Sequence, residues 1–175
     1  MANLLEYDDC VTDYLKKIAP WAKTVLSYPE EKINAIGPAI FWGVTSIAPA
    51  GSNGSGEMDM QLTVTVLVAV STQKANSEIH VRDLATYLIA NIHDNRLDLG
   101  AGYKHATVTR SESSEFEPNL AGFSVWSIEF EQVITIGANK ITATEFAPGK
   151  VFVGLAPDIG AAHVDDYELV YEKER

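Results

Sequence analysis

Ser55 is the residue whose neighbours most resemble those of a catalytic nucleophile, because it stands between Gly54 and Gly56. A nucleophilic serine needs a base beside it and a rigid turn that joins a strand to a helix. No helical pattern follows this glycine-rich stretch, which also lacks the Gly-Lys-Ser/Thr ending of a phosphate-binding loop. We therefore interpret the stretch as a flexible loop and predict no nucleophilic catalysis there.

Metal-binding patterns are also missing from the sequence. Asp8, Asp9 and Asp13 are close together, but we expect them on the solvent side of an N-terminal helix. No pair of histidines has the His-x-x-x-His spacing that places two imidazoles on one face of a helix. The four histidines are His80, His93, His105 and His163. The sequence thus predicts no metal site and no cofactor.

Glu129 and Glu131 form the one pair of carboxylates that repeats on one side of an expected strand. Two such groups can act as acid and base if burial moves their pKa values apart. A solvated strand face explains the pair more simply, and a third alternative is that the pair faces a channel or a neighbouring subunit. Cys10 lies beside an apolar helical stripe, which favours a packed thiol over a reactive one.

Composition limits the class of protein. The chain has 175 residues, is 46% hydrophobic and has a net charge of -11. This length suits one soluble globular domain, and the acidic balance opposes tight binding of nucleic acid. The longest apolar run, residues 64–70, is too short to cross a membrane. The N-terminus lacks the pattern of a secretory signal, and the single cysteine fits a reducing compartment.

Two helices are expected from apolar residues at three-and-four spacing. The first follows Asn3, which together with Glu6 resembles a capping box, and ends before Pro20. Its apolar face consists of Tyr7, Val11, Tyr14, Leu15 and Ile18. The second helix starts with Ser77 as its cap and Glu78 in its first turn. Its stripe consists of Val81, Leu84, Ala85, Leu88, Ile89 and Ile92.

The remaining pattern predicts strands. Residues 58–71 and 123–136 alternate apolar and polar side chains most regularly. Residues 22–28, 39–47 and 104–109 are further candidates, with a mobile loop or a hairpin tip at 49–56 and an acidic turn at 111–119. The fold class expected is α/β of the α+β type. A mostly antiparallel sheet carries an N-terminal helix and a long amphipathic helix on it. Residues 1–137 would form this core, and residues 138–175 an acidic, extended C-terminal segment.

In the order of these elements and in the sequences of three strands, the chain resembles the tail terminator proteins of tailed bacteriophages, specifically the Mu-like branch of contractile-tailed phages. The strings concerned are PAIFWGV at 38–44, LTVTVLVAV at 62–70 and FSVWSIEFEQVITIG at 123–137. The resemblance covers residues 1–137 and rests on arrangement, since this family has no invariant catalytic signature.

The resemblance implies a structural virion protein without catalytic activity. Such proteins form a ring, usually a hexamer, that caps the tail tube, ends its polymerisation and joins the tail to the neck while DNA passes through the pore. The implied partners are further copies of the chain, the tube and sheath proteins, and neck or head-completion proteins, with no membrane and no specific binding of nucleic acid. The implied location is the neck region of the virion tail, after assembly in the host cytoplasm.

Under this resemblance, the glycine-rich loop and the C-terminal segment are the candidate contact regions. The candidate contact residues are Gly51, Ser52, Asn53, Gly54, Val151, Val153, Asp165, Asp166 and Tyr167. Acids along a pore would repel the phosphates of passing DNA. The candidate lumen-facing acids are Glu112, Glu115, Glu117, Glu129 and Glu131.

Two other functions remain compatible with the sequence. A different head–tail joining or neck protein could have a similar small α/β core. A small hydrolase or ligand-binding α/β domain would need a concave apolar pocket in which polar groups converge.

Overall fold

The computed structural model describes residues 3–27, 37–52, 54–114, 120, 122–140, 150–154 and 162–172. The chain forms two compact units, Met1–Ala138 and Asn139–Arg175. The first unit contains α1 (Leu4–Ile18), β1 (Thr24–Ser27), β2 (Ala39–Ser52), β3 (Met58–Ser71), α2 (Ser77–Ile92), β4 (Thr107–Ser113) and β5 (Phe123–Ile136). The second contains β6 (Lys150–Val153), a 3₁₀ turn (Val164–Asp166) and β7 (Glu168–Glu172).

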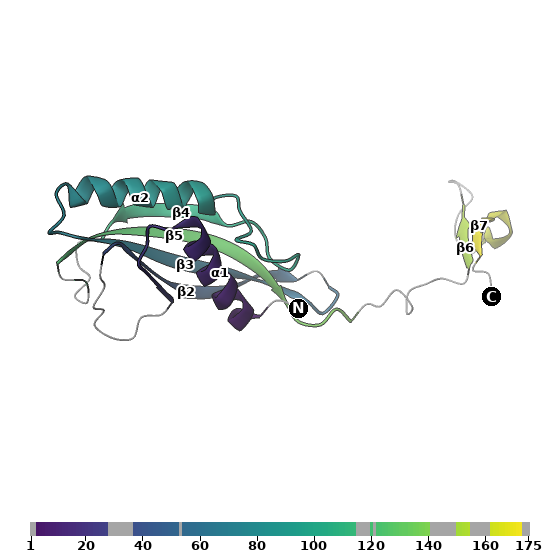
Figure 1. Cartoon of the computed structure of the whole chain (residues 1–175). Coiled ribbons are helices and arrows are strands. Elements are labelled where there is room, and N and C mark those ends of the chain that lie inside the picture. The colour runs from purple at the N-terminus through teal and green to yellow at the C-terminus, as the bar shows by residue number, and fades with distance from the viewer. Residues whose placement is uncertain are drawn as a thin grey trace. The chain divides into compact units, whose positions relative to one another are not determined.

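The first unit is built on a five-stranded sheet with the order β1-β2-β3-β5-β4 (Figure 1). The β1 strand runs parallel to β2, and every other neighbouring pair is antiparallel. The prediction of an α+β fold with a mostly antiparallel sheet and two packed helices is thereby confirmed. Neither helix in the described part of the chain is long and apolar enough to cross a bilayer.

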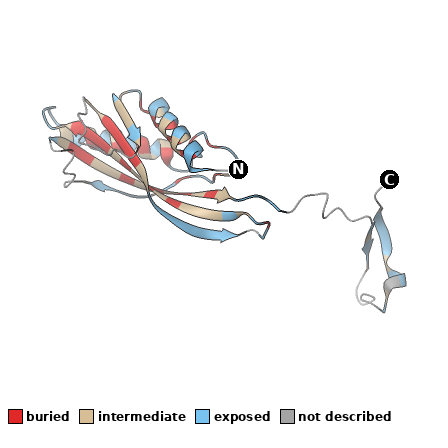
Figure 2. Cartoon of the chain, turned by 90° about the horizontal axis from the view of Figure 1, so that it is seen from below, coloured by how far each residue is buried: buried red, intermediate tan, exposed pale blue. Residues whose placement is uncertain are grey.

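Both helices pack on the same face of the sheet. The buried stripes of α1 and α2 form one cluster with alternate residues of β2, β3 and β5, such as Trp42, Val66 and Phe130. Figure 2 shows buried residues along β3 and β5 and an exposed second half of β2, whose buried residues are its first four. On the opposite face a smaller cluster lies at one end of the sheet, around Phe41 and Val125. Beyond this cluster the same face carries Glu129 and Glu131 of β5 opposite Thr65 and Thr63 of β3.

The α1 helix begins as expected. The Asn3 side chain accepts a hydrogen bond from the Glu6 backbone N–H at 2.8 Å, which satisfies a donor that the first turn leaves free. The prediction for Asp8 is wrong, because this residue is half-buried and accepts a hydrogen bond from the Ser27 hydroxyl at 2.9 Å. The β1 strand covers this side of the helix, and a periodicity count cannot detect a strand that packs there.

The start of α2 also differs from its prediction. Asn76, in the left-handed conformation, is the residue before the helix, and Ser77 belongs to the first turn. The two residues expected at the cap bind the sheet instead: the buried Ser124 hydroxyl lies 2.9 Å from Ser77 Oγ and 2.8 Å from Glu78 Oε1. The first turn of α2 is thus attached to β5 by side chains.

The β2 strand continues to Ser52, so residues 49–56 lie at the end of the β2–β3 hairpin, which is the second predicted alternative, and residues 49–52 still belong to the strand. The partner strand supplies the reason, since β3 pairs with β2 as far as Met58 opposite Ser52. Pro49 is tolerated because this part of β2 has a register shift between Pro49 and Gly51. Pairing with a neighbouring strand thus overrides a composition typical of loops.

The β4 strand begins at Thr107 and ends at Ser113, so the predicted strand at 104–109 is shifted and the predicted turn at 111–119 is wrong at residues 111–113. Residues 115–119 of that turn lie outside the described residues. The Lys104 N–H donates a hydrogen bond to the Val133 carbonyl, but Lys104 is not part of the regular pairing between β4 and β5. Ser111, Glu112 and Ser113 pair with β5 residues, which extends the strand into the predicted turn.

The second unit contains a two-stranded antiparallel sheet of β6 and β7. The sequence predicted only an extended acidic segment here, and the pairing of β6 with β7 was not predicted. The ring of Tyr167 packs on Gly154, where an added Cβ would lie 2.7 Å from the ring. A side chain at position 154 would therefore displace Tyr167.

Candidate functional site

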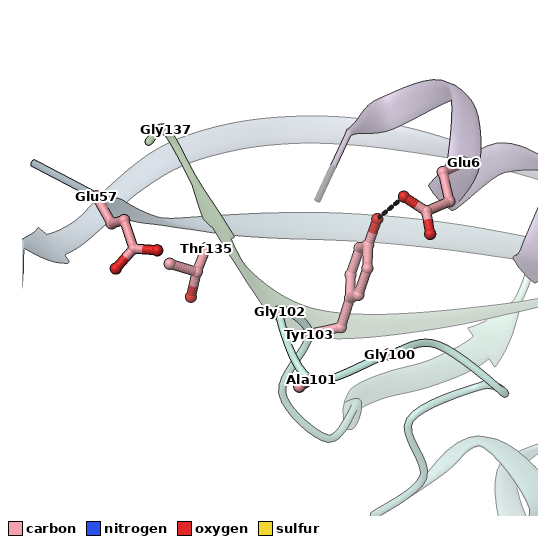
Figure 3. A pocket seen from close by; sticks show the side chains of 8 residues that line it. All are labelled: Glu6, Glu57, Gly100, Ala101, Gly102, Tyr103, Thr135 and Gly137. Atoms are coloured by element: carbon pink, nitrogen blue, oxygen red, sulfur yellow. Dashed lines mark hydrogen bonds between the residues drawn. The ribbon is translucent and has the colours of Figure 1, made fainter. Parts of the chain in front are cut away.

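A pocket of about 440 Å³ lies in the first unit, where the ends of β3 and β5 meet the segment between α2 and β4. Figure 3 shows Glu6 and Tyr103 on one side of this pocket, and Glu57 and Thr135 on the other. The lining residues are Glu6, Glu57, Gly100, Ala101, Gly102, Tyr103, Thr135 and Gly137. This is the concave site in which any catalytic function would first be sought.

The side chains of this pocket do not form an acid–base or nucleophile–base pair. The Tyr103 hydroxyl lies 3.3 Å from the Asn3 carbonyl and 3.5 Å from Glu6 Oε2. Burial raises the pKa of the Tyr103 hydroxyl, which makes the phenolate harder to form. None of the described residues that line the pocket is a histidine, lysine or cysteine. No metal-binding group of His, Cys, Asp or Glu occurs among the residues that the structure describes.

Asp59 connects the pocket wall to its surroundings. It accepts hydrogen bonds from Thr135 Oγ1 at 2.7 Å and from the Lys104 ammonium at 2.9 Å. The Lys104 hydrogen bond, followed by that from Thr135, lowers the pKa of the Asp59 carboxyl. The carboxylate form is therefore stabilised in the folded protein.

The Asp59→Asn variant is expected to lose stability only where Asp59 is charged. Because folding lowers this pKa, the contribution is fully present above the unfolded-state value of about 3.9 and is lost as the pH falls through the folded-state value. We expect a loss below about 1 kcal/mol at pH 7, since the ion pair is partly exposed. Urea unfolding at several pH values checks this, and an equal loss at about pH 2 would contradict it.

The face of the sheet away from the helices carries the two carboxylates that the alternation predicted there. Glu129 and Glu131 are half-buried on β5, opposite Thr65 and Thr63 of β3. The Thr109 hydroxyl lies 3.4 Å from Glu129 Oε1. Hydroxyl and carboxylate groups dominate this part of the sheet, so it presents an acidic, hydrogen-bonding surface.

The other predicted lumen-facing acids are Glu112, Glu115 and Glu117. Glu112 lies on the edge strand β4 and forms an ion pair with Arg110 at 2.7 Å, so its charge is largely balanced. Glu115 and Glu117 lie outside the described residues. Among the predicted acids that the structure describes, Glu129 and Glu131 are therefore the ones without a basic side chain within ion-pair distance.

The predicted contact residues of the glycine-rich stretch lie at the end of a protruding hairpin. Gly51 and Ser52 are exposed at the end of β2, and Gly54 belongs to the turn that follows, whereas Asn53 lies outside the described residues. Every residue of β2 from 45 to 52 is exposed, including the apolar Ile47. Figure 2 shows this exposed part of the hairpin. The structure thus places Gly51 and Ser52 on an accessible strand and Gly54 in the bend at the end of the hairpin.

The predicted contact residues of the second unit lie on its small hairpin. Val151 and Val153 are on β6, and Asp165, Asp166 and Tyr167 precede β7. Five apolar side chains of this hairpin are exposed: Phe152, Val153, Leu169, Val170 and Tyr171. Because a two-stranded hairpin is marginally stable alone in water, so much exposed apolar surface marks a region suited to contact with another protein.

A buried polar link was missed in the sequence. The Tyr7 hydroxyl donates to Gln132 Oε1 at 2.9 Å, and Gln132 Nε2 donates to the Lys104 carbonyl at 2.7 Å. Gln132 is almost fully buried and occupies a core position in the alternation of β5. A glutamine at a position where the alternation of β5 calls for an apolar residue is the sequence signal that could have revealed this link.

Cys10 is half-buried beside the core, as expected for a packed thiol. Burial, together with nearby acids led by Glu6, raises the pKa of its thiol. A raised pKa lowers the thiolate fraction and hence the reactivity.

Comparison with known proteins identifies no family for this chain. No family model matches it, and no curated protein matches its sequence. Among solved structures, it is similar to a chain of the "Virion of native gene transfer agent (GTA) particle". The two chains are 12% identical with a TM-score of 0.49, and the match covers 75% of the present chain and 94% of the other. A likeness this distant does not carry the role of that chain over to the present one.

Proposed function

We propose that this protein is a structural component of a phage-like virion, and more specifically a tail terminator. In this role copies of the chain form a ring, six being the number expected, that caps the tail tube, ends its polymerisation and joins the tail to neck proteins. The sequence resemblance supports this role. The helices and strands on whose order the resemblance rests are present in that order in the fold.

The observation that carries the proposal is the one-sided packing of the sheet. Both helices cover one face, which leaves an acidic face with Glu129 and Glu131 uncovered beside a protruding β2–β3 hairpin. A ring needs two different patches on each subunit, since heterologous contacts close around an axis. The hairpin arm and the small second unit provide exposed candidates for such contacts.

Addition of the purified protein to growing tail tubes tests the proposal. A terminator should bind one tube end as a ring with a central hole and stop elongation, which electron microscopy detects. A protein that leaves tube length unchanged and binds the head side would be a different neck component. A turnover abolished by a point substitution in the Figure 3 pocket would instead indicate an enzyme.

Charge reversal on the open face is expected to slow the passage of DNA. If Glu129 and Glu131 line the pore, the Glu129→Lys/Glu131→Lys variant replaces repulsion of phosphate by attraction. DNA ejection from virions assembled with this variant, followed by dye fluorescence, should be roughly tenfold slower at low salt and recover as salt is raised.

The control for this prediction carries the same change of charge on the helical layer. Asp13 and Asp83 are exposed on α1 and α2, so Asp13→Lys/Asp83→Lys should eject DNA at the normal rate. Equal slowing in both variants would show that net charge, and not the open face, determines the effect.

A further inference from the structure

A second cavity lies at the start of α1 and is distinct from the pocket in Figure 3. It measures about 360 Å³ and is lined by Leu4, Leu5, Tyr7, Asp8, Asp9 and Val44. We call it the α1–β2 groove. Its walls are mostly apolar, and Leu5 is 82% exposed while Leu4 is 46% exposed. Two adjacent leucines this accessible beside a cavity are typical of a surface that another molecule covers.

Asp8 adds a specific chemical requirement to this groove. Its Oδ2 atom accepts the Ser27 hydrogen bond at 2.9 Å. Its Oδ1 atom is buried and has no hydrogen-bond partner in the described part of the chain. A buried carboxylate oxygen without a donor is unfavourable and is strongly stabilised by a charged N–H group. The groove therefore lacks a cationic donor next to its apolar walls.

We propose that the α1–β2 groove binds a segment of a partner protein that presents an arginine or lysine between apolar residues. The cation pairs with the Asp8 carboxylate, whose Oδ1 atom is shielded from solvent in the free chain and becomes accessible when the groove side chains move. Asp9 adds a second negative charge at the rim, and the apolar neighbours cover Leu4 and Leu5. The carboxylates exclude a nucleic acid or an anionic lipid surface by repulsion. A chain with 24 acidic and 13 basic residues is itself a less suitable source of the segment than a basic partner.

This inference is independent of ring formation, because it concerns one groove of a single subunit. A test with purified protein and a peptide therefore does not depend on tail assembly. Absence of tube capping would leave the groove proposal standing, and failure of peptide binding would leave the capping proposal standing.

Titration with the peptide acetyl-Leu-Arg-Leu-amide, followed by NMR on isotope-labelled protein, tests the groove. Shifts should concentrate on residues 4–9 and on Val44. The same peptide with citrulline keeps the shape of arginine without its charge. It should bind about tenfold more weakly, since hydrogen bonds to charged groups are the strong ones. Equal binding of the two peptides, shifts elsewhere, or no binding below about 10 mM would overturn the proposal.

Two variants and a control complete the test. Asp8→Asn removes the charge and should abolish the preference for arginine over citrulline. Leu5→Ser changes a side chain too exposed to affect folding and should weaken both peptides about fivefold. Ile79→Ser alters another exposed apolar residue, on α2, and should change nothing. Unchanged arginine preference in a folded Asp8→Asn protein would contradict the assignment of Asp8.

Discussion

Replacement of Phe130 by alanine is expected to lower the free energy of unfolding by about 3–5 kcal/mol, the usual cost of removing a buried aromatic ring. Phe130 is 1% exposed at the middle of β5, between Val64 of β3 and Val108 of β4. Its ring belongs to the cluster that joins the sheet to both helices. A cavity there would weaken both layers of the first unit together.

Thermal or urea unfolding of the Phe130→Ala variant measures this effect. For a chain of this size the melting temperature should fall by roughly 6–20 °C. Ile79→Ala, at an exposed position of α2, is the control and should change the free energy by less than about 0.5 kcal/mol. A loss below about 1 kcal/mol for Phe130→Ala would contradict the packing described here.

Gln132→Leu is expected to cost about 2–4 kcal/mol, although leucine is the more apolar residue. The substitution removes the hydrogen bonds that Gln132 forms with the buried Tyr7 hydroxyl and with the part-buried Lys104 carbonyl. Each hydrogen bond lost from a buried polar group costs about 1–3 kcal/mol. The link therefore stabilises the contact of α1 with β5 only while all three groups are present.

A double-mutant cycle separates this link from simple packing. Tyr7→Phe alone should cost about 1–2 kcal/mol, because Gln132 Oε1 loses its donor. The Tyr7→Phe/Gln132→Leu protein should be more stable than the sum of the single effects predicts, since both partners are removed together. Tyr87→Phe, at an exposed tyrosine of α2, is the matched control. Strictly additive losses would show that the two side chains do not interact.

The elements with strong internal periodicity were predictable from the sequence. The β3 and β5 strands have the predicted bounds because alternation over 14 residues identifies a strand with one buried face. The stripe of α1 was predicted correctly for the same reason, with Tyr7 and Val11 among its buried residues. Local periodicity was sufficient where each element has its own buried face.

The remaining features depend on partners distant in the chain. The last residues of β2 read as a loop and become a strand because β3 lies beside them. The half-burial of Asp8 depends on Ser27, and the role of Gln132 depends on Tyr7, which is 125 residues away. No pattern within a short window encodes these contacts. The α1–β2 groove was missed for the same reason, since it joins the start of α1 to Val44.

The length of tails in particles that lack this protein tests the central claim most directly. Electron microscopy of such particles should show tails of variable length that are not joined to filled heads. Resupply of the protein should restore one uniform length and the junction. Tails of normal, uniform length attached to filled heads in its absence would contradict the proposal that this chain ends tail assembly.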